Sequence, residues 1–290
     1  MKKPSPTSSR AAPIKQSPED WWSTAIIEMR PGVIRYRGYA IEELIGRIGF
    51  ADMIWLMTRG ELPKPAQANL LEAALVAAVD HGPQAPSIAV ARMAITCGVG
   101  INNAMASAIN VLGDVHGGAG EQCVEFYQAV AARLENSSRP VEPRAISSAA
   151  IAEMAAFAQR GGRHIPGFGH RFHPVDPRAP RLLALVDIAA KSGTVSGRYA
   201  AIGRAIESAL TKQKGRKIPM NIDGATAVIF AELGFAAPLC RGLFVLSRSV
   251  GALAHAWEES QSRERNKGPL PRQLLWTYRG PKPRPLKRDR

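Results

Sequence analysis

The chain has 290 residues, of which 46% are hydrophobic and 21% are charged. This composition is close to the globular average and excludes a wholly disordered or collagen-like chain. The formal net charge is +14, and residues 263–290 alone carry +8. The basic character is therefore mainly a property of the C-terminal end, and it implies little about the rest of the fold.

The predicted elements are almost all helical. Residues 1–19 are rich in Pro, Ser and Lys, which predicts a disordered tail, and residues 33–39 form a short β-like piece. Apolar residues then recur at three- and four-residue spacing, with Pro and Gly at the ends of each stretch. In chain order, we expect helices over residues 41–48, 51–58, 66–79, 87–112, 121–134, 146–160, 180–191, 198–212, 225–233 and 241–262. Without a βαβ period, the predicted fold class is all-α.

The longest uncharged stretch, residues 93–113, is long enough to span a bilayer. It contains three Asn and three Gly, so we expect it to be a buried helix and expect no membrane partner. Residues 1–20 lack the apolar core of a secretory signal. The three cysteines, Cys97, Cys123 and Cys240, have no CxxC spacing and are expected to be small buried hydrophobic residues in a reducing compartment. These features predict a cytoplasmic protein.

Residues 161–180 form a long loop of Gly, Pro, His and Arg, and loops of this length in compact domains are usually functional or disordered. Its histidine spacing matches no standard metal site, so we expect no metal. Three arginines supply positive charge and two glycines expose their amides, which favours an anionic ligand. These residues are Arg163, Arg171, Arg178, Gly167 and Gly169.

Four further residues are candidates for chemistry. His81 ends a predicted helix, where the helix dipole would favour its charged form, and His116 precedes two glycines that allow close approach of a substrate. Asp223 is either the N-cap of the next helix or a partly desolvated carboxylate suited to act as a general base. Arg248 lies among apolar residues, so it needs a ligand carboxylate, an acid elsewhere in the fold, or a path to solvent.

Five motifs then occur in one order over about residues 30–280, and together they resemble the citrate synthase superfamily. They are YRGYxIEEL with GELP (residues 36–44 and 60–63), HGGA (116–119), GFGH with DPR (167–170 and 176–178), NID (221–223) and SR (247–248). The resemblance implies a large and a small helical domain. The large domain would comprise residues 20–160 and 226–280, the small CoA-binding domain residues 161–225, and the basic tail residues 281–290.

The resemblance also implies roles for individual residues. Asp223 would take a proton from the α-carbon of an acyl-CoA thioester, while His116 donates to the thioester oxygen. His170 would protonate the carbonyl of the acceptor keto acid. The resemblance further assigns acceptor binding to His81, Arg178, Arg248 and Arg272, and CoA binding to Arg163, Gly167, Phe168, Gly169 and Arg171. It implies a CoA thioester as co-substrate, no tightly bound cofactor, and a homodimer or higher homo-oligomer.

Two departures from the family pattern refine this expectation. The interval between the GELP motif and His81 is short, which is more similar to stand-alone citryl-CoA lyase and the C-terminal module of ATP-citrate lyase. Leu270 stands where the family has an Arg, which leaves the acceptor acid open. The predicted function is carbon–carbon bond cleavage or formation on citryl-CoA, or on acetyl-CoA with oxaloacetate or a related 2-oxo acid. The alternatives are a citrate or 2-methylcitrate synthase that releases CoA, and a non-catalytic CoA-binding regulator. Charge alone suggests a nucleic-acid binder, and no recognition motif supports one.

Overall fold

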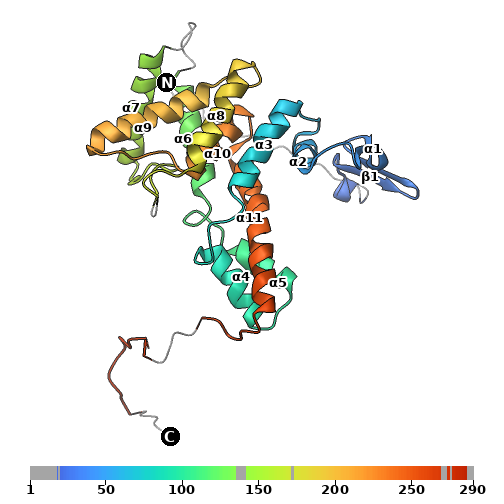
Figure 1. Cartoon of the computed structure of the whole chain (residues 1–290), viewed down its shortest axis with the longest axis vertical. Helices are drawn as coiled ribbons and strands as arrows, with labels where there is room; N and C mark the ends of the chain where they lie inside the picture. Colours follow the sequence, from blue (N-terminus) through green and yellow to red (C-terminus); the bar gives the residue numbers. More distant parts are fainter. Residues whose placement is uncertain are drawn as a thin grey trace, which may run out of the picture. The chain divides into compact units, whose positions relative to one another are not determined.

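The computed structural model describes residues 18, 20–134, 142–170, 173–268, 273–274 and 276–285. Apart from one small sheet, the regular structure of these residues is helical (Figure 1), which confirms the predicted all-α class. The chain divides between Asn69 and Leu70 into two compact units. The division into a large and a small domain at residues 161 and 225 stays a prediction.

The first unit contains a short 3₁₀ helix (Asp20–Trp22), the small sheet and two complete α-helices. Strands β1 (Ile27–Arg30), β2 (Val33–Tyr36) and β3 (Tyr39–Ala40) pair antiparallel in that order. The predicted β-like piece is therefore β2 and β3, and β1 was not predicted. Helix α1 (Ile41–Leu44) is shorter than the predicted helix over 41–48, because Gly46 has a φ of +77°. Helix α2 (Phe50–Arg59) follows, as expected.

Nine helices carry the remainder of the described chain. Helix α3 (Pro65–Ala77) crosses the boundary between the units, and eight more follow it in the second unit. They are α4 (Pro86–Thr96), α5 (Ile101–Asn110), α6 (Ala119–Ala132), α7 (Pro143–Gln159), α8 (Arg178–Lys191), α9 (Arg198–Lys214), α10 (Ile222–Glu232) and α11 (Ala237–Gln261).

Helix α10 forms the core of the second unit. Nine of its eleven residues are buried, and it packs against α6, α8 and α9 (Figure 1). A helix that is apolar on all sides must lie inside a protein, so the position of α10 is determined by its neighbours. Its first turn is therefore held in a defined place, and this turn carries Asp223.

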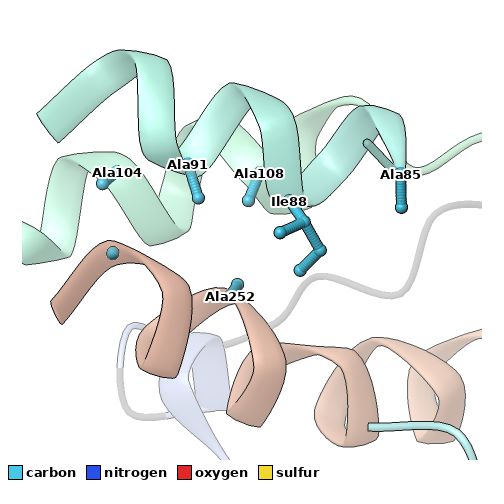
Figure 2. Close-up of a cluster of buried hydrophobic side chains, with 7 residues drawn as sticks. Ala85, Ile88, Ala91, Ala104, Ala108 and Ala252 are labelled. Atoms are coloured by element: carbon cyan, nitrogen blue, oxygen red, sulfur yellow. The ribbon is translucent and has the colours of Figure 1, made fainter. Parts of the chain in front are cut away.

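The predicted single helix over residues 87–112 is wrong, because the chain forms α4 and α5 with a turn between them. Gly98 has a φ of +88°, which disfavours other residues and ends α4. The two helices pack on α11 through small side chains (Figure 2). The buried cluster comprises Ala85, Ile88, Ala91, Ala104, Ala108, Ala252 and Ala256. Because alanine allows close approach of helix backbones, this packing fixes the loops that precede α4 and follow α5.

Two further expectations concern membrane spans and cysteines. Among the described residues, no helix has the length and apolar character needed to cross a membrane. Cys123 and Cys240 are buried as expected, but Cys97 is exposed. Cys97 lies at the C-terminal end of α4, where the chain turns toward the surface.

Candidate active site

A cleft of about 770 Å³ opens in the second unit. It lies where the loops before α4, before α6 and before α10 meet the middle of α11. Five of the predicted site residues that carry ionisable side chains line it. They are His81, His116, His170, Asp223 and Arg248.

His116 is fixed by the first turn of α4. Its Nε2 lies 3.1 Å from the backbone N of Ser87 and 3.0 Å from the Ser87 Oγ. A backbone N–H can only donate, so Nε2 accepts and a neutral ring carries its proton on Nδ1. Burial, and then the charge of Arg248, lowers the pKa of His116. The cleft therefore holds a neutral imidazole that can donate a hydrogen bond, the form suited to polarise a carbonyl.

Asp223 lies in the first turn of α10, and the structure assigns the cap of that helix to Asn221. The Asn221 Oδ1 accepts hydrogen bonds from the backbone N–H groups of Asp223 (2.9 Å) and Gly224 (3.2 Å). No described residue donates a hydrogen bond to the Asp223 carboxylate. Burial raises its pKa, and the nearby Arg248 and Arg178 oppose this effect. Asp223 is thus a carboxylate of increased basicity at the wall of the cleft.

The loop that carries His170 is attached directly to the start of α10. The Asn221 N–H donates to the Gly167 carbonyl at 3.0 Å, and the Gly169 N–H donates to the Pro219 carbonyl at 2.7 Å. The Asn221 side-chain amide also donates to the Gly169 carbonyl at 2.7 Å. Gly167 has a φ of +84°, and a Cβ there would lie 2.6 Å from the Cys123 Sγ. Glycine is required for this contact, which brings His170 to the cleft of Asp223.

His170 and His81 lie close together across the cleft, with ring centroids 5.5 Å apart. The His170 Nδ1 accepts the backbone N–H of His173 at 3.0 Å, so a neutral His170 donates from Nε2. Burial lowers the pKa of both rings, and the charges of Arg178 and Arg248 lower that of His81 further. The expectation of a charged His81 at a helix end is therefore wrong, because α3 ends at Ala77 and burial and two arginines lower the pKa of His81.

Arg248 is buried, with 6% of its surface exposed. Its Nε donates to the Ala78 carbonyl at 3.3 Å, and its guanidinium lies over the Phe244 ring at 4.8 Å. Among the described residues, no carboxylate lies within ion-pair distance of it. Glu259, farther along α11, is 1% exposed and pairs with Arg92. A buried cation without a carboxylate partner is suited to bind an anionic ligand.

Arg178 is already engaged by a neighbouring acid. Its Nε and Nη2 each lie 2.9 Å from an oxygen of Asp176, a bidentate pair. Asp176 is buried and also accepts the backbone N–H of Ile222 at 3.0 Å. This carboxylate therefore joins the first turn of α8 to the first turn of α10, and Arg178 does not line the cleft.

The remaining predicted residues lie in several places. Gly169 lines the cleft, whereas Arg163 is exposed outside it and the Phe168 ring packs against Tyr127. Arg171, Leu270 and Arg272 lie outside the described residues. Among the described residues, no group of three His, Cys, Asp or Glu side chains could hold a metal ion.

Sequence reasoning missed three residues that position the site. Asn221 could have been found, because Asn two residues before an acid at the start of a helix is a common N-cap. Asp176 lies in the DPR motif, but neither its contact with Ile222 nor that of Ser87 with His116 has a sequence signal, since these partners lie 46 and 29 residues away.

Comparison with known proteins places this geometry in context. The profile of the family described as "Citrate synthase, C-terminal domain" matches residues 63–272. A citrate synthase of Acidithiobacillus ferridurans is 27% identical over 227 residues, which cover 74% of this chain and 52% of that protein. A probable ATP-citrate synthase of Dictyostelium discoideum is 23% identical, with 83% of this chain and 39% of that protein covered. The chain thus spans about half or less of the length of these curated relatives.

Solved structures give a fuller match. Citryl-CoA lyase from Hydrogenobacter thermophilus superposes with a TM-score of 0.77 and 31% identity, covering 92% of this chain and 98% of that one. ATP citrate lyase of Methanosaeta concilii, in complex with (3S)-citryl-CoA, gives a TM-score of 0.72 over 90% of this chain and 42% of that one. At 19% identity, this second match supports the fold alone.

Proposed function

The chain belongs to the citrate synthase family, and we propose that it cleaves or forms a carbon–carbon bond in a CoA thioester, as a citryl-CoA lyase does. The observation that carries the proposal is the shared cleft of His116, His170, Asp223 and Arg248. The short interval between the GELP motif and His81 and the 31% identity to citryl-CoA lyase over 92% of this chain favour the lyase over a citrate synthase.

In the proposed mechanism, enolisation needs a base and an oxygen-side donor that act together. Asp223 takes the α-proton of the acetyl thioester in condensation and returns it in cleavage. Neutral His116 donates from Nδ1 to the thioester oxygen, where negative charge develops. Its Nε2 is held by Ser87 at 3.1 Å, so the ring is already oriented for this task. Each proton-transfer role contributes about 10²–10⁴-fold to the rate.

On the acceptor side, the proposed roles fall to His170, His81 and Arg248. The Nε2–H of His170 donates to the carbonyl oxygen of the 2-oxo acid as it becomes the hydroxyl of the product. Arg248 binds a carboxylate of the acceptor, which supplies the anion that its buried guanidinium lacks. His81 lies beside His170 and completes the acceptor pocket. Arg178, held by Asp176, acts on this pocket through its charge.

The CoA portion is proposed to lie along the loop of residues 161–170, where Arg163 is exposed and Gly169 reaches the cleft. We propose that CoA enters as co-substrate. Arg171 and Arg272 stay candidates for CoA and acceptor binding, respectively. The small domain over residues 161–225 and the cytoplasmic location remain part of the proposal, and three unpaired cysteines fit a reducing compartment.

A homodimer or higher homo-oligomer is proposed from the surface of α11. Four large apolar side chains lie exposed on one stripe of this helix, at spacings of four, three and four residues. They are Leu246 (45% exposed), Val250 (57%), Leu253 (44%) and Trp257 (58%). Such a stripe is typical of a helix that packs against a partner. Light scattering at micromolar concentration should give at least twice the chain mass of 31.2 kDa, and a monomer would refute this proposal.

The deciding experiment supplies the full chain with citryl-CoA, or with acetyl-CoA and oxaloacetate, and identifies the products by mass. A lyase converts citryl-CoA to acetyl-CoA and oxaloacetate. Release of free CoA with citrate would favour the second candidate, a citrate synthase. The similarity to a citrate synthase of Acidithiobacillus ferridurans supports this candidate. Binding of CoA thioesters without turnover of either substrate would overturn both and identify a regulatory protein.

A further inference from the structure

A chain of polar contacts runs from α11 to the loop that carries His81, outside the cleft itself. The Asp80 Oδ2 accepts the Gly82 N–H at 3.1 Å and faces the His255 Nε2 at 3.3 Å. The His255 Nδ1 faces the Arg92 Nη1 at 2.9 Å. Since neither His255 nor Asp80 lines the cleft, the mechanism above gives them no role.

The direction of these hydrogen bonds follows from chemistry. A guanidinium can only donate, so the His255 Nδ1 is an acceptor and the ring proton lies on Nε2, which donates to Asp80. Arg92 is fixed in turn, because its Nε lies 2.5 Å from the buried carboxylate of Glu259. Lys267 pairs with the other Glu259 oxygen at 3.1 Å. The orientation of the Asp80 carboxylate is therefore fixed by His255, which is held in turn by Arg92 and Glu259.

The His81 loop also sits directly on the helix backbone. A Cβ at Gly251 would lie 2.2 Å from the Val79 carbonyl and 3.2 Å from the Asp80 Oδ1. That oxygen is buried and receives no hydrogen bond from any described residue. The same oxygen lies 3.3 Å from the His255 Nε2. His255 therefore contacts both carboxylate oxygens of Asp80, and Gly82 donates to Oδ2, so the carboxylate is held between α11 and its own loop. The next residue in the chain is His81.

We propose that His255 is a positioning residue that acts through Asp80 to hold the His81 loop in the orientation that binds the acceptor acid. This inference rests on the proposed function for the nature of the ligand. It concerns the acceptor half of the cleft only, because His116 and Asp223 are held by Ser87 and by α10 instead. A defect in this relay should therefore affect the acceptor and spare the CoA thioester.

Three variants of the full chain test the proposal. His255→Leu removes the donor to Asp80, whereas His255→Gln retains an N–H group that can replace Nε2. The matched control is Glu258→Gln, which alters an exposed partner of the same Arg92, 4.0 Å from the His255 Nδ1, and leaves the Nε2 donor to Asp80 in place. With oxaloacetate varied against acetyl-CoA, we expect His255→Leu to raise the oxaloacetate KM about tenfold, the loss of one hydrogen bond to a charged group. The acetyl-CoA KM should stay within about twofold, and His255→Gln and Glu258→Gln should resemble wild type.

A second readout does not depend on turnover. In the ¹⁵N spectrum of histidine-labelled chain, His255 should show the Nε2–H tautomer, and the His81 signal should shift in His255→Leu but not in Glu258→Gln. Asp80→Ala removes the acceptor of the His255 Nε2–H and should also shift the His81 signal, which provides a second variant in case His255→Leu folds poorly. If wild type shows no turnover but His81 shifts, the proposed function fails and the positioning role stands. An unchanged His81 signal, or an equal rise in both KM values, would overturn the positioning role.

Discussion

The substitution Asp223→Asn should separate the proposed catalytic role of this residue from its contribution to stability. The cap of α10 is Asn221, whose Oδ1 accepts the N–H groups of Asp223 and Gly224, while the Ile222 N–H donates to Asp176, so the cap survives the substitution. Loss of a negative charge from the helix N-terminus costs about 0.3–1 kcal/mol. Burial raises the pKa of Asp223, which means that the ionised carboxylate is itself disfavoured in the fold. Because these effects oppose each other, we expect unfolding free energy to change by less than about 1 kcal/mol.

The expected effect on chemistry is much larger. Asparagine cannot accept the α-proton, and loss of a general base costs about 10²–10⁴-fold in rate, equivalent to about 3–5 kcal/mol in the barrier. Exchange of solvent deuterium into the acetyl methyl group isolates this step. With a non-reactive analogue of the acceptor present, wild type should exchange and Asp223→Asn should not, while CoA thioester affinity is retained.

Asn221→Ala provides the contrasting case. It removes the cap and should cost about 0.5–2 kcal/mol of stability, with the base left in the chain. Equal exchange rates in wild type and Asp223→Asn would refute the assignment of the base. A large loss of melting temperature in Asp223→Asn would refute the argument that the cap of α10 does not depend on the Asp223 side chain.

Three further predictions use the same structure. Gly167→Ala should destabilise the fold by about 2–4 kcal/mol, because the strain of a positive φ adds to overpacking. The control is Gly193→Ala, where φ is +72° but a Cβ would meet no atom within 4 Å. Similar melting temperatures of these two variants would contradict the clash at Gly167. Arg248→Met should raise the acceptor KM about 10–10²-fold and leave the CoA-thioester KM unchanged; an equal rise in both would place the anion elsewhere. The melting temperature should fall as pH drops below 6.5. Three histidine rings have a lowered pKa in the folded protein, so they bind protons in the unfolded state at a pH where they stay neutral in the folded state, and this favours unfolding. A melting temperature that is flat across this range would contradict the prediction. The rings are His81, His116 and His170.

Family and fold class were predictable from the sequence because the motifs are local and occur in order. Apolar spacing located most helices to within a few residues of their ends. The break at Gly98 was missed because apolar residues continue through it at helical spacing, and only the φ of +88° reveals the turn. A single glycine within a helical pattern is tolerated, so the pattern alone could not decide.

The candidate site was predictable as a set of residues but not as a geometry. The motifs named His116, His170, Asp223 and Arg248, and the structure brings them to one cleft, while their catalytic roles stay predictions. The pairing of Arg178 with Asp176 was not foreseen. The Arg178 guanidinium can pair either with Asp176 or with a bound ligand. Which of the two it binds depends on how deeply Asp176 is buried, and this cannot be predicted from the sequence.

Asp223 and Arg248 are the charged pair that the cleft leaves available. Arg178 is paired with Asp176, and the Asn221 side chain caps α10. Neither Arg178 nor Asn221 donates a hydrogen bond to the Asp223 carboxylate. The two remaining groups act on each other at a distance: Arg248 lowers the pKa of Asp223, opposing the effect of burial. A carboxylate that binds at Arg248 would offset that positive charge, and burial would then act on Asp223 with less opposition. In the proposed mechanism, an acceptor carboxylate bound at Arg248 would therefore raise the pKa of Asp223 and make it a stronger base for the α-proton of the thioester when the acceptor is present to receive the enolate.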